Sequence, residues 1–104
     1  MNAQLKKGSL DLCVLALLGR SDMYGYELVQ RISRVVEISE GTIYPLLKRI
    51  KDDGCVTTYL KESQAGAPRK YYSITRTGLE RRDELAREWH AFADGINAIL
   101  KGGN

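Results

Sequence analysis

The spacing of apolar residues changes period twice along this chain, and this change constrains the fold more than any other feature. Up to Gly54 the large apolar residues recur at the spacing of helical faces. From Cys55 to Thr75 they alternate with polar residues, as in strands, and beyond Thr75 the helical spacing returns. The pattern predicts three helices, a β-hairpin and a long final helix, which is a mainly α fold with a small β-hairpin.

Residues that favour helix ends divide the first half of the chain. Ser9 is a candidate N-cap, Asp11 would follow in the first turn, and Gly19 would end the first helix. A second helix is expected to begin near 24–26, and Ser39 is the candidate N-cap of a third. With 104 residues the chain has room for one domain.

The third helix is expected to bury one narrow stripe and leave its other faces exposed. The stripe consists of apolar residues at helical spacing, Ile43, Leu46, Leu47 and Ile50. The remaining faces carry polar and basic residues, namely Thr42, Tyr44, Lys48, Arg49 and Lys51. Pro45 leaves two interpretations open, because the regular helix could begin at this residue or be kinked there in its first turn.

Two alternating segments predict the hairpin. The strands are expected at 55–61 and 69–75, joined by a loop of small residues at 63–68. In this interpretation Arg69 and Lys70 lie at the hairpin tip, where they could follow a nucleic-acid backbone.

Three tyrosines have an expected position of their own. Tyr72 is expected to face the core because neighbouring residues of a strand face opposite sides. Tyr24 and Tyr26 are expected to plug the junction of the second helix with the core, with Tyr26 also near DNA.

The last helix, expected over 75–100, carries a heptad seam. The seam consists of large apolar residues separated by four, three, four and three positions, Leu85, Trp89, Phe92, Ile96 and Ile99. A domain that already has its own core cannot cover this seam, so it predicts a homodimer. The expected organisation is therefore a winged helix-turn-helix domain at 1–76 and a dimerisation helix at 77–104, together forming one compact unit.

The order of elements and the distribution of charge both favour binding to double-stranded DNA. The formal net charge is +3, and residues 39–76, with seven basic and four acidic side chains, have the largest local excess. In a winged helix-turn-helix the third helix enters the major groove, and a dimer reads a pseudo-palindromic site. The predicted DNA-binding residues are Tyr26, Thr42, Tyr44, Lys48, Arg49, Lys51, Arg69 and Lys70.

Other functions have little support in the sequence. There is no phosphate-binding glycine motif and no nucleophile motif, and with His90 as the one histidine no metal site or cofactor is expected, so we do not expect an enzyme. The longest apolar run, 12–18, is too short to span a membrane, and we expect a cytoplasmic protein. Two alternatives remain, a winged-helix protein-interaction module and a thiol-based redox regulator that uses Cys13 or Cys55.

Four segments resemble the PadR-like family of bacterial transcriptional regulators. They are Gly8–Leu18, Tyr24–Leu28, Gly41–Ile50 and Arg69–Thr75, the last followed by Gly78, in the order and spacing of the family. The resemblance implies a winged-helix homodimer that represses transcription, with a C-terminal helix at the dimer interface. The single short C-terminal helix is similar to the compact subgroup, which includes regulators of multidrug transporters.

The resemblance also suggests an effector site. In the compact subgroup a tryptophan of the last helix lines a hydrophobic pore between the subunits, and Trp89 falls at the matching position. We therefore expect planar hydrophobic small molecules to bind beside an apolar set, Leu85, Trp89, Phe92 and Ile96. The sequence departs from the family at 39–41, where proline is often second, and at 65–68, where the wing is less basic.

Overall fold

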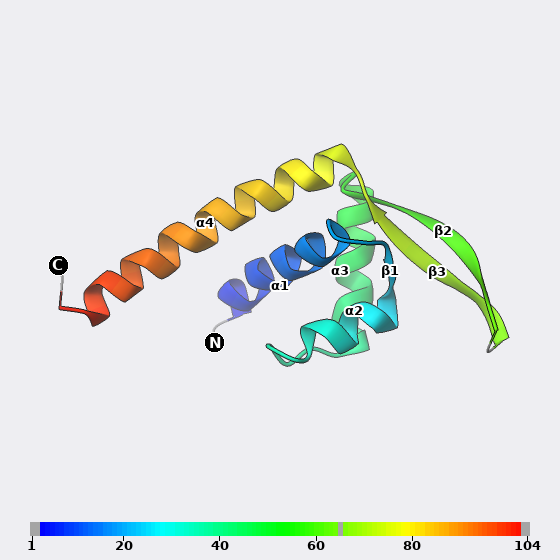
Figure 1. The fold of residues 1–104 in the computed structure, drawn as a ribbon, viewed down its shortest axis with the longest axis horizontal. Helices are drawn as coiled ribbons and strands as arrows, with labels where there is room; N and C mark the ends of the chain where they lie inside the picture. Colours follow the sequence, from blue (N-terminus) through cyan, green and yellow to red (C-terminus); the bar gives the residue numbers. More distant parts are fainter. Residues whose placement is uncertain (1–2, 65, 103–104) are drawn as a thin grey trace.

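The computed structural model describes residues 3–64 and 66–102, and in these it contains four helices and three strands (Figure 1). In chain order the elements are α1 (Ala3–Leu18), β1 (Met23–Tyr24), α2 (Gly25–Ile32), α3 (Glu40–Asp52), β2 (Val56–Ser63), β3 (Gly66–Ile74) and α4 (Arg76–Leu100). The winged-helix fold with a long final helix is therefore confirmed. Strand β1, of two residues, was not predicted.

Helix α1 begins earlier than the sequence pattern predicts, whereas α3 begins directly after its predicted N-cap, Ser39. Helix α1 begins at Ala3, so Ser9 lies inside the helix and its predicted role as N-cap is wrong. Asp11 is consequently not in the first turn, and it is buried against α3. Helix α3 begins at Glu40, which excludes the interpretation that it starts at Pro45.

Pro45 removes one hydrogen bond without ending α3. The carbonyl that loses its partner belongs to Gly41, four residues back in the exposed first turn, where water can replace the missing donor. Ser39 precedes the helix in an extended conformation, as its predicted N-cap position requires. Its carbonyl accepts hydrogen bonds from the backbone N–H groups of Thr42 and Ile43 at 3.1 and 3.0 Å, so the helix is established before the proline.

The sheet is antiparallel, with β3 between β1 and β2. Arg69 lies opposite Lys61 and Lys70 lies opposite Leu60, whereas the last pair before the hairpin end is Ser63 and Gly66. The prediction that Arg69 and Lys70 form the hairpin tip is therefore wrong. Both side chains lie on the flank of the β2–β3 hairpin, which is the wing of this fold, and they are closer to the helices than the hairpin tip is.

Small residues, which are typical of a loop, form part of a strand here. Strand β3 already begins at Gly66 and includes Pro68, although Ala65 of the predicted loop lies outside the described residues. The register shifts between Lys61 and Ser63, and such an irregular strand pair tolerates a proline that donates no hydrogen bond. Leu60 is exposed because the wing extends beyond the core.

The core lies where the first three helices meet the base of the sheet. Its most deeply buried side chains are Val14, Leu15, Leu18, Leu28, Ile32, Ile43 and Leu47. Tyr72 is buried against them, as predicted, and Tyr24 is half-buried. Tyr26 is exposed, so its predicted role as a plug of the core is wrong.

Helix α4 starts at a tightly packed junction with the end of α3. The Thr75 hydroxyl accepts a hydrogen bond from the Gly78 N–H at 3.1 Å and donates one to the Gly54 carbonyl at 2.6 Å. A Cβ at Gly78 would collide with the Cys55 carbonyl oxygen and with the Ile74 side chain. The junction therefore requires a glycine at 78 and fixes the direction in which α4 leaves the domain.

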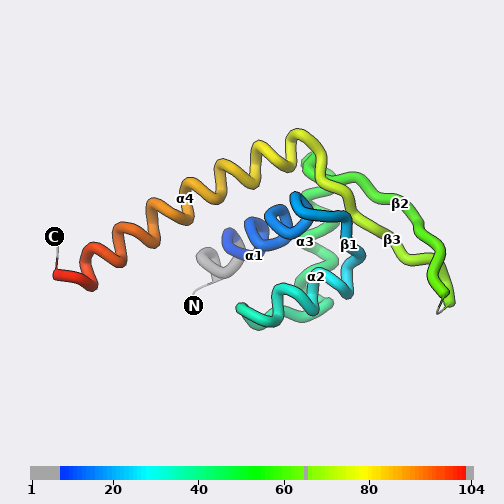
Figure 2. Tube along the Cα trace, in the orientation of Figure 1, coloured from blue at the N-terminus to red at the C-terminus, as the bar shows by residue number. Residues whose placement is uncertain are grey.

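The C-terminal half of α4 projects beyond the rest of the molecule (Figure 2). The described part of the chain measures 55 × 27 × 21 Å and has a radius of gyration of 15.5 Å. A compact domain of this length has a radius of gyration of about 13 Å. The excess reflects the projecting helix, whose large apolar side chains from Trp89 to Leu100 are between 39% and 78% exposed.

Candidate nucleic-acid interface

Helix α3 divides its side chains between the core and solvent as its sequence pattern predicts. The four residues of the apolar stripe are buried, namely Ile43, Leu46, Leu47 and Ile50. Thr42, Tyr44, Lys48 and Lys51 are exposed. The face predicted to read DNA is thus directed away from the core.

The ring of Tyr44 is held by close packing against the start of α2. A Cβ at Gly25 would lie 2.5 to 2.8 Å from atoms of this ring, so a glycine is needed for the two helices to approach. Burial, and then the nearby Glu40 carboxylate, raise the pKa of Tyr44. The tyrosine therefore remains a neutral phenol, able to donate and accept hydrogen bonds at the protein surface.

A groove runs between α3 and β3. One part, of about 400 Å³, is lined by side chains of both elements, including Tyr44, Lys48, Lys51 and Lys70. The adjoining part, of about 310 Å³, shares Tyr44 and Lys70 with the first and adds Arg69. We call this surface the basic groove, defined by Tyr44, Lys48, Lys51, Arg69 and Lys70. It joins side chains from the third helix with side chains from the wing.

The basic groove carries a clear excess of positive charge. Four of its five defining residues are cationic, and one acidic side chain, Asp52, also lines it. Lys48 contacts Asp52 at 3.1 Å, but both side chains are highly exposed, 80% and 65%, so water and salt weaken this pair. A surface of this kind attracts a polyanion such as the DNA backbone.

Arg49 occupies a different environment from the other basic residues of α3. Its guanidinium donates two hydrogen bonds to the Asp11 carboxylate, at 2.8 and 2.9 Å, in a bidentate ion pair between α3 and α1. The Asp11 side chain is only 10% exposed and that of Arg49 is 38% exposed. The hydrogen bond to Asp11 raises the pKa of Arg49. The two residues are 38 positions apart, and no sequence pattern predicts their pairing.

Tyr26 lies apart from the basic groove. It lines a separate depression along α2, of about 550 Å³, together with Gln30, Arg31 and Arg34. Both arginines are exposed. The structure therefore does not bring Tyr26 together with the other predicted DNA-binding residues, and its contact with DNA stays a prediction.

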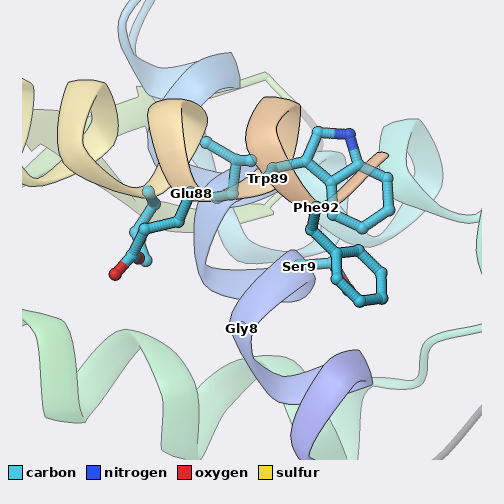
Figure 3. A pocket seen from close by; sticks show the side chains of 7 residues that line it. Gly8, Ser9, Glu88, Trp89 and Phe92 are labelled. Atoms are coloured by element: carbon cyan, nitrogen blue, oxygen red, sulfur yellow. The ribbon is translucent and has the colours of Figure 1, made fainter. Parts of the chain in front are cut away.

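A small apolar pocket, of about 150 Å³, lies between α1 and α4. Figure 3 shows the rings of Trp89 and Phe92 reaching from α4 over the turn of α1 that carries Gly8 and Ser9. The two ring centroids are 6.1 Å apart with their planes tilted by 43°. The structure thus brings Leu85, Trp89 and Phe92 into one pocket, while the predicted Ile96 does not line it.

The contribution of α1 to this pocket was not predicted from the sequence. Gly8, Ser9 and Leu12 line one side of it, opposite the aromatic rings. The early start of α1 is what places these residues in a helix beside α4. Gly8 within a helical segment was the available signal, because a glycine there leaves room for a neighbour.

The cysteines do not have the character of redox sensors. Cys55 is buried and Cys13 is half-buried, and burial raises the pKa of both thiols. A raised pKa keeps a thiol protonated and unreactive at neutral pH.

Among the described residues no group of three metal-binding side chains comes together. None of the helices in that part of the chain is long and apolar enough to cross a membrane.

The fold and the basic groove define a winged-helix protein of the DNA-binding class. The family model described as "Transcriptional regulator PadR-like family" matches residues 14–84. The chain therefore belongs to the PadR-like family of transcriptional regulators. Members of this family are non-enzymatic DNA-binding proteins, which confirms the expected class of function.

Individual proteins are similar to this chain in structure or in sequence. A PadR-like transcriptional regulator from Bacillus cereus strain ATCC 14579 has a similar structure, with a TM-score of 0.84, 37% identity and coverage of 94% of this chain and 97% of that chain. The smu.1704 structure from Streptococcus mutans gives a TM-score of 0.87 at 34% identity, covering 92% and 90%. The transcriptional regulator YqjI of Escherichia coli is 28% identical over 91% of this chain, which spans only 46% of that relative.

Proposed function

We propose that the protein is a cytoplasmic repressor that binds a pseudo-palindromic operator as a homodimer and is released by a planar hydrophobic effector. The observation that carries the DNA-binding part is the basic groove. In this proposal α3 of each subunit enters the major groove, Tyr44 reads base edges, and the lysines and Arg69 contact phosphates.

The proposed DNA-reading set differs slightly from the predicted one. Thr42, Lys48 and Lys51 stay in it because they are exposed on the same helix as Tyr44. We leave Arg49 out, because the bidentate pair with Asp11 already uses its guanidinium. Arg49 instead holds α3 in position against α1.

Binding to DNA is tested with a gel-shift assay that compares a duplex from the chain's own upstream region with random duplex at two salt concentrations. Tyr44→Ala is expected to reduce the ratio of the two affinities, since a side chain directed at bases reads sequence. Lys70→Ala is expected to weaken both complexes equally and to reduce the salt slope by about 0.9 per bound subunit. An unchanged affinity ratio in Tyr44→Ala would show that Tyr44 does not read the operator.

The proposed dimer rests on the apolar seam of α4. Trp89 is 39% exposed, Phe92 45%, Ile96 42% and Ile99 63% in the single chain. Complete burial of a fully exposed side chain of this size contributes about 1.5–3 kcal/mol, so covering the part that is still exposed would contribute roughly half of that for each residue. Sedimentation at micromolar concentration is expected to give twice the chain mass of 11.7 kDa, and a monomer at that concentration would rule out the dimer. The proposed boundary between the DNA-binding domain and the dimerisation helix stays at 76/77.

The proposed effector site is the pocket at Trp89. Its walls are mostly apolar, and the indole offers a flat surface for a planar ring system. Trp89 is the single tryptophan, so its fluorescence reports on this pocket. Titration with planar hydrophobic dyes is expected to quench it in a saturable way and to release the DNA. Release that persists in Trp89→Ala would remove this residue from the mechanism.

A further inference from the structure

Three tyrosines form a ladder across the outer face of the sheet. Tyr24 of β1 and Tyr59 of β2 both lie directly opposite Tyr71 of β3. Tyr24 and Tyr71 meet edge to face, with centroids 5.4 Å apart, and Tyr59 and Tyr71 are stacked at 5.7 Å. The Tyr59 hydroxyl donates a hydrogen bond of 2.7 Å to Asp22, which anchors the ladder to the segment before β1.

The ladder supports two cations of the wing. The Lys61 ammonium lies over the ring of Tyr71, 5.1 Å from its centroid, and the Arg69 guanidinium lies over the ring of Tyr24 at 4.6 Å. Both distances fall within the range of cation–π attraction. The two cations differ in position, because Arg69 also lines the basic groove, while Lys61 does not line either part of it.

The end of β1 explains why Arg69 can reach the groove. Strand β1 stops at Tyr24, opposite Tyr71, and the chain turns there into α2. The part of β3 that carries Arg69 therefore has no strand beside it on this side. The guanidinium extends over this free edge, rests on the Tyr24 ring, and meets the groove next to Gly25 and Tyr44.

We infer that Tyr24 is a positioning residue for DNA binding, which acts by holding the Arg69 guanidinium at the mouth of the basic groove, ready for a backbone phosphate. This inference rests on the proposed DNA-binding function. An arginine free in solvent must be ordered when it binds, and that ordering reduces affinity. A guanidinium already held over a ring loses less freedom on binding, and its N–H groups can still donate to a phosphate.

A double-mutant cycle in DNA affinity tests this inference. In the wild-type background Arg69→Gln is expected to weaken binding to the upstream duplex about fivefold to tenfold and to reduce the salt slope by about 0.9 per bound subunit. In the Tyr24→Leu background the same Arg69→Gln change is expected to weaken binding less than about twofold, because the two residues act together. Tyr24→Phe keeps the ring and is expected to preserve the full effect of Arg69→Gln.

Lys61→Gln is the matched control. It removes one positive charge from the same sheet face, and because Lys61 rests on Tyr71, its effect is expected to be the same with and without Tyr24→Leu. If Tyr24→Leu fails to fold, as judged by circular dichroism, Tyr24→Thr removes the ring with a residue that favours strands.

The outcomes separate this inference from the proposed function. An equal loss from Arg69→Gln with and without the Tyr24 ring would overturn the inference while leaving DNA binding intact. A loss from Tyr24→Leu that persists undiminished in Arg69→Gln would also overturn it, since Tyr24 would then act without Arg69. Failure of the wild-type protein to shift any duplex would contradict the proposed function itself.

Discussion

The ion pair between Asp11 and Arg49 provides a test of whether Arg49 stabilises the fold or contacts DNA. Arg49→Ala would leave the Asp11 carboxylate, which is 10% exposed, without its bidentate partner. Breaking a fully buried pair in this way costs about 3–5 kcal/mol, and the 38% exposure of Arg49 lowers our expectation to roughly 2–4 kcal/mol.

The reverse substitution is expected to be milder. Asp11→Ala leaves the Arg49 guanidinium unpaired, but at 38% exposure it can be hydrated, so we expect a loss of about 1–2 kcal/mol. Arg49→Lys keeps the charge and loses the planar fork, and is expected to recover less than half of the effect of Arg49→Ala. We therefore expect Arg49→Ala to lower the free energy of unfolding more than Asp11→Ala does.

Urea unfolding followed by circular dichroism measures these changes, at one protein concentration for all variants because dimerisation would shift apparent stability. Lys48→Ala is the control, since it removes an ion pair of similar length, 3.1 Å, from the exposed side of the same helix. We expect it to stay within about 0.5 kcal/mol of the wild type. An Arg49→Ala protein as stable as Lys48→Ala but impaired in DNA binding would refute the structural role and restore Arg49 as a DNA contact.

Two further predictions concern other parts of the fold. Gly78→Ala is expected to lower the free energy of unfolding by about 1–3 kcal/mol or more, because the new methyl group would collide with the Cys55 backbone. Gly41→Ala is the control: its methyl group would make only an ordinary contact, so we expect no change or a gain of up to about 1 kcal/mol. Equal effects of the two alanines on the urea midpoint would contradict this. The hydrogen bond to Asp22 raises the pKa of Tyr59 above its ordinary value of 10.0. The stability that this hydrogen bond contributes is therefore present below pH 10 and is lost as the pH rises through the pKa of the folded state. The difference in urea midpoint between wild type and Tyr59→Phe should therefore shrink above about pH 10, and a difference independent of pH would show that this bond does not contribute.

Features that depend on local spacing were predictable from the sequence. The apolar stripe of α3 and its exposed opposite face follow from the helical period alone, and so does the buried side of β3 at Tyr72. Tyr44, Lys48 and Lys51 are exposed together for the same reason. The sequence therefore predicts that the proposed DNA-reading face of α3 points away from the core.

Features that depend on contacts between distant segments were not predictable. The partner of Arg49 lies on α1, and no spacing rule joins the two helices. Strand β1 has two residues, too few for an alternating pattern, and it is defined by its pairing with β3. The pairing register of β2 with β3 depends on where the turn falls. The run of small residues at 63–68 is compatible with a turn at several positions.

The seam of α4 combines both kinds of information. Its spacing predicted a continuous apolar face, but the spacing did not indicate where the domain's own core stops covering it. In the structure Leu85 packs against the core, whereas Ile96 and Ile99 are 42% and 63% exposed. A helical segment beyond the domain gains little from its own propensity, and Gly95 within it costs about 1 kcal/mol relative to alanine. From about Trp89 onward, α4 therefore has little cover from its own chain, and in the proposed homodimer the second copy supplies this burial.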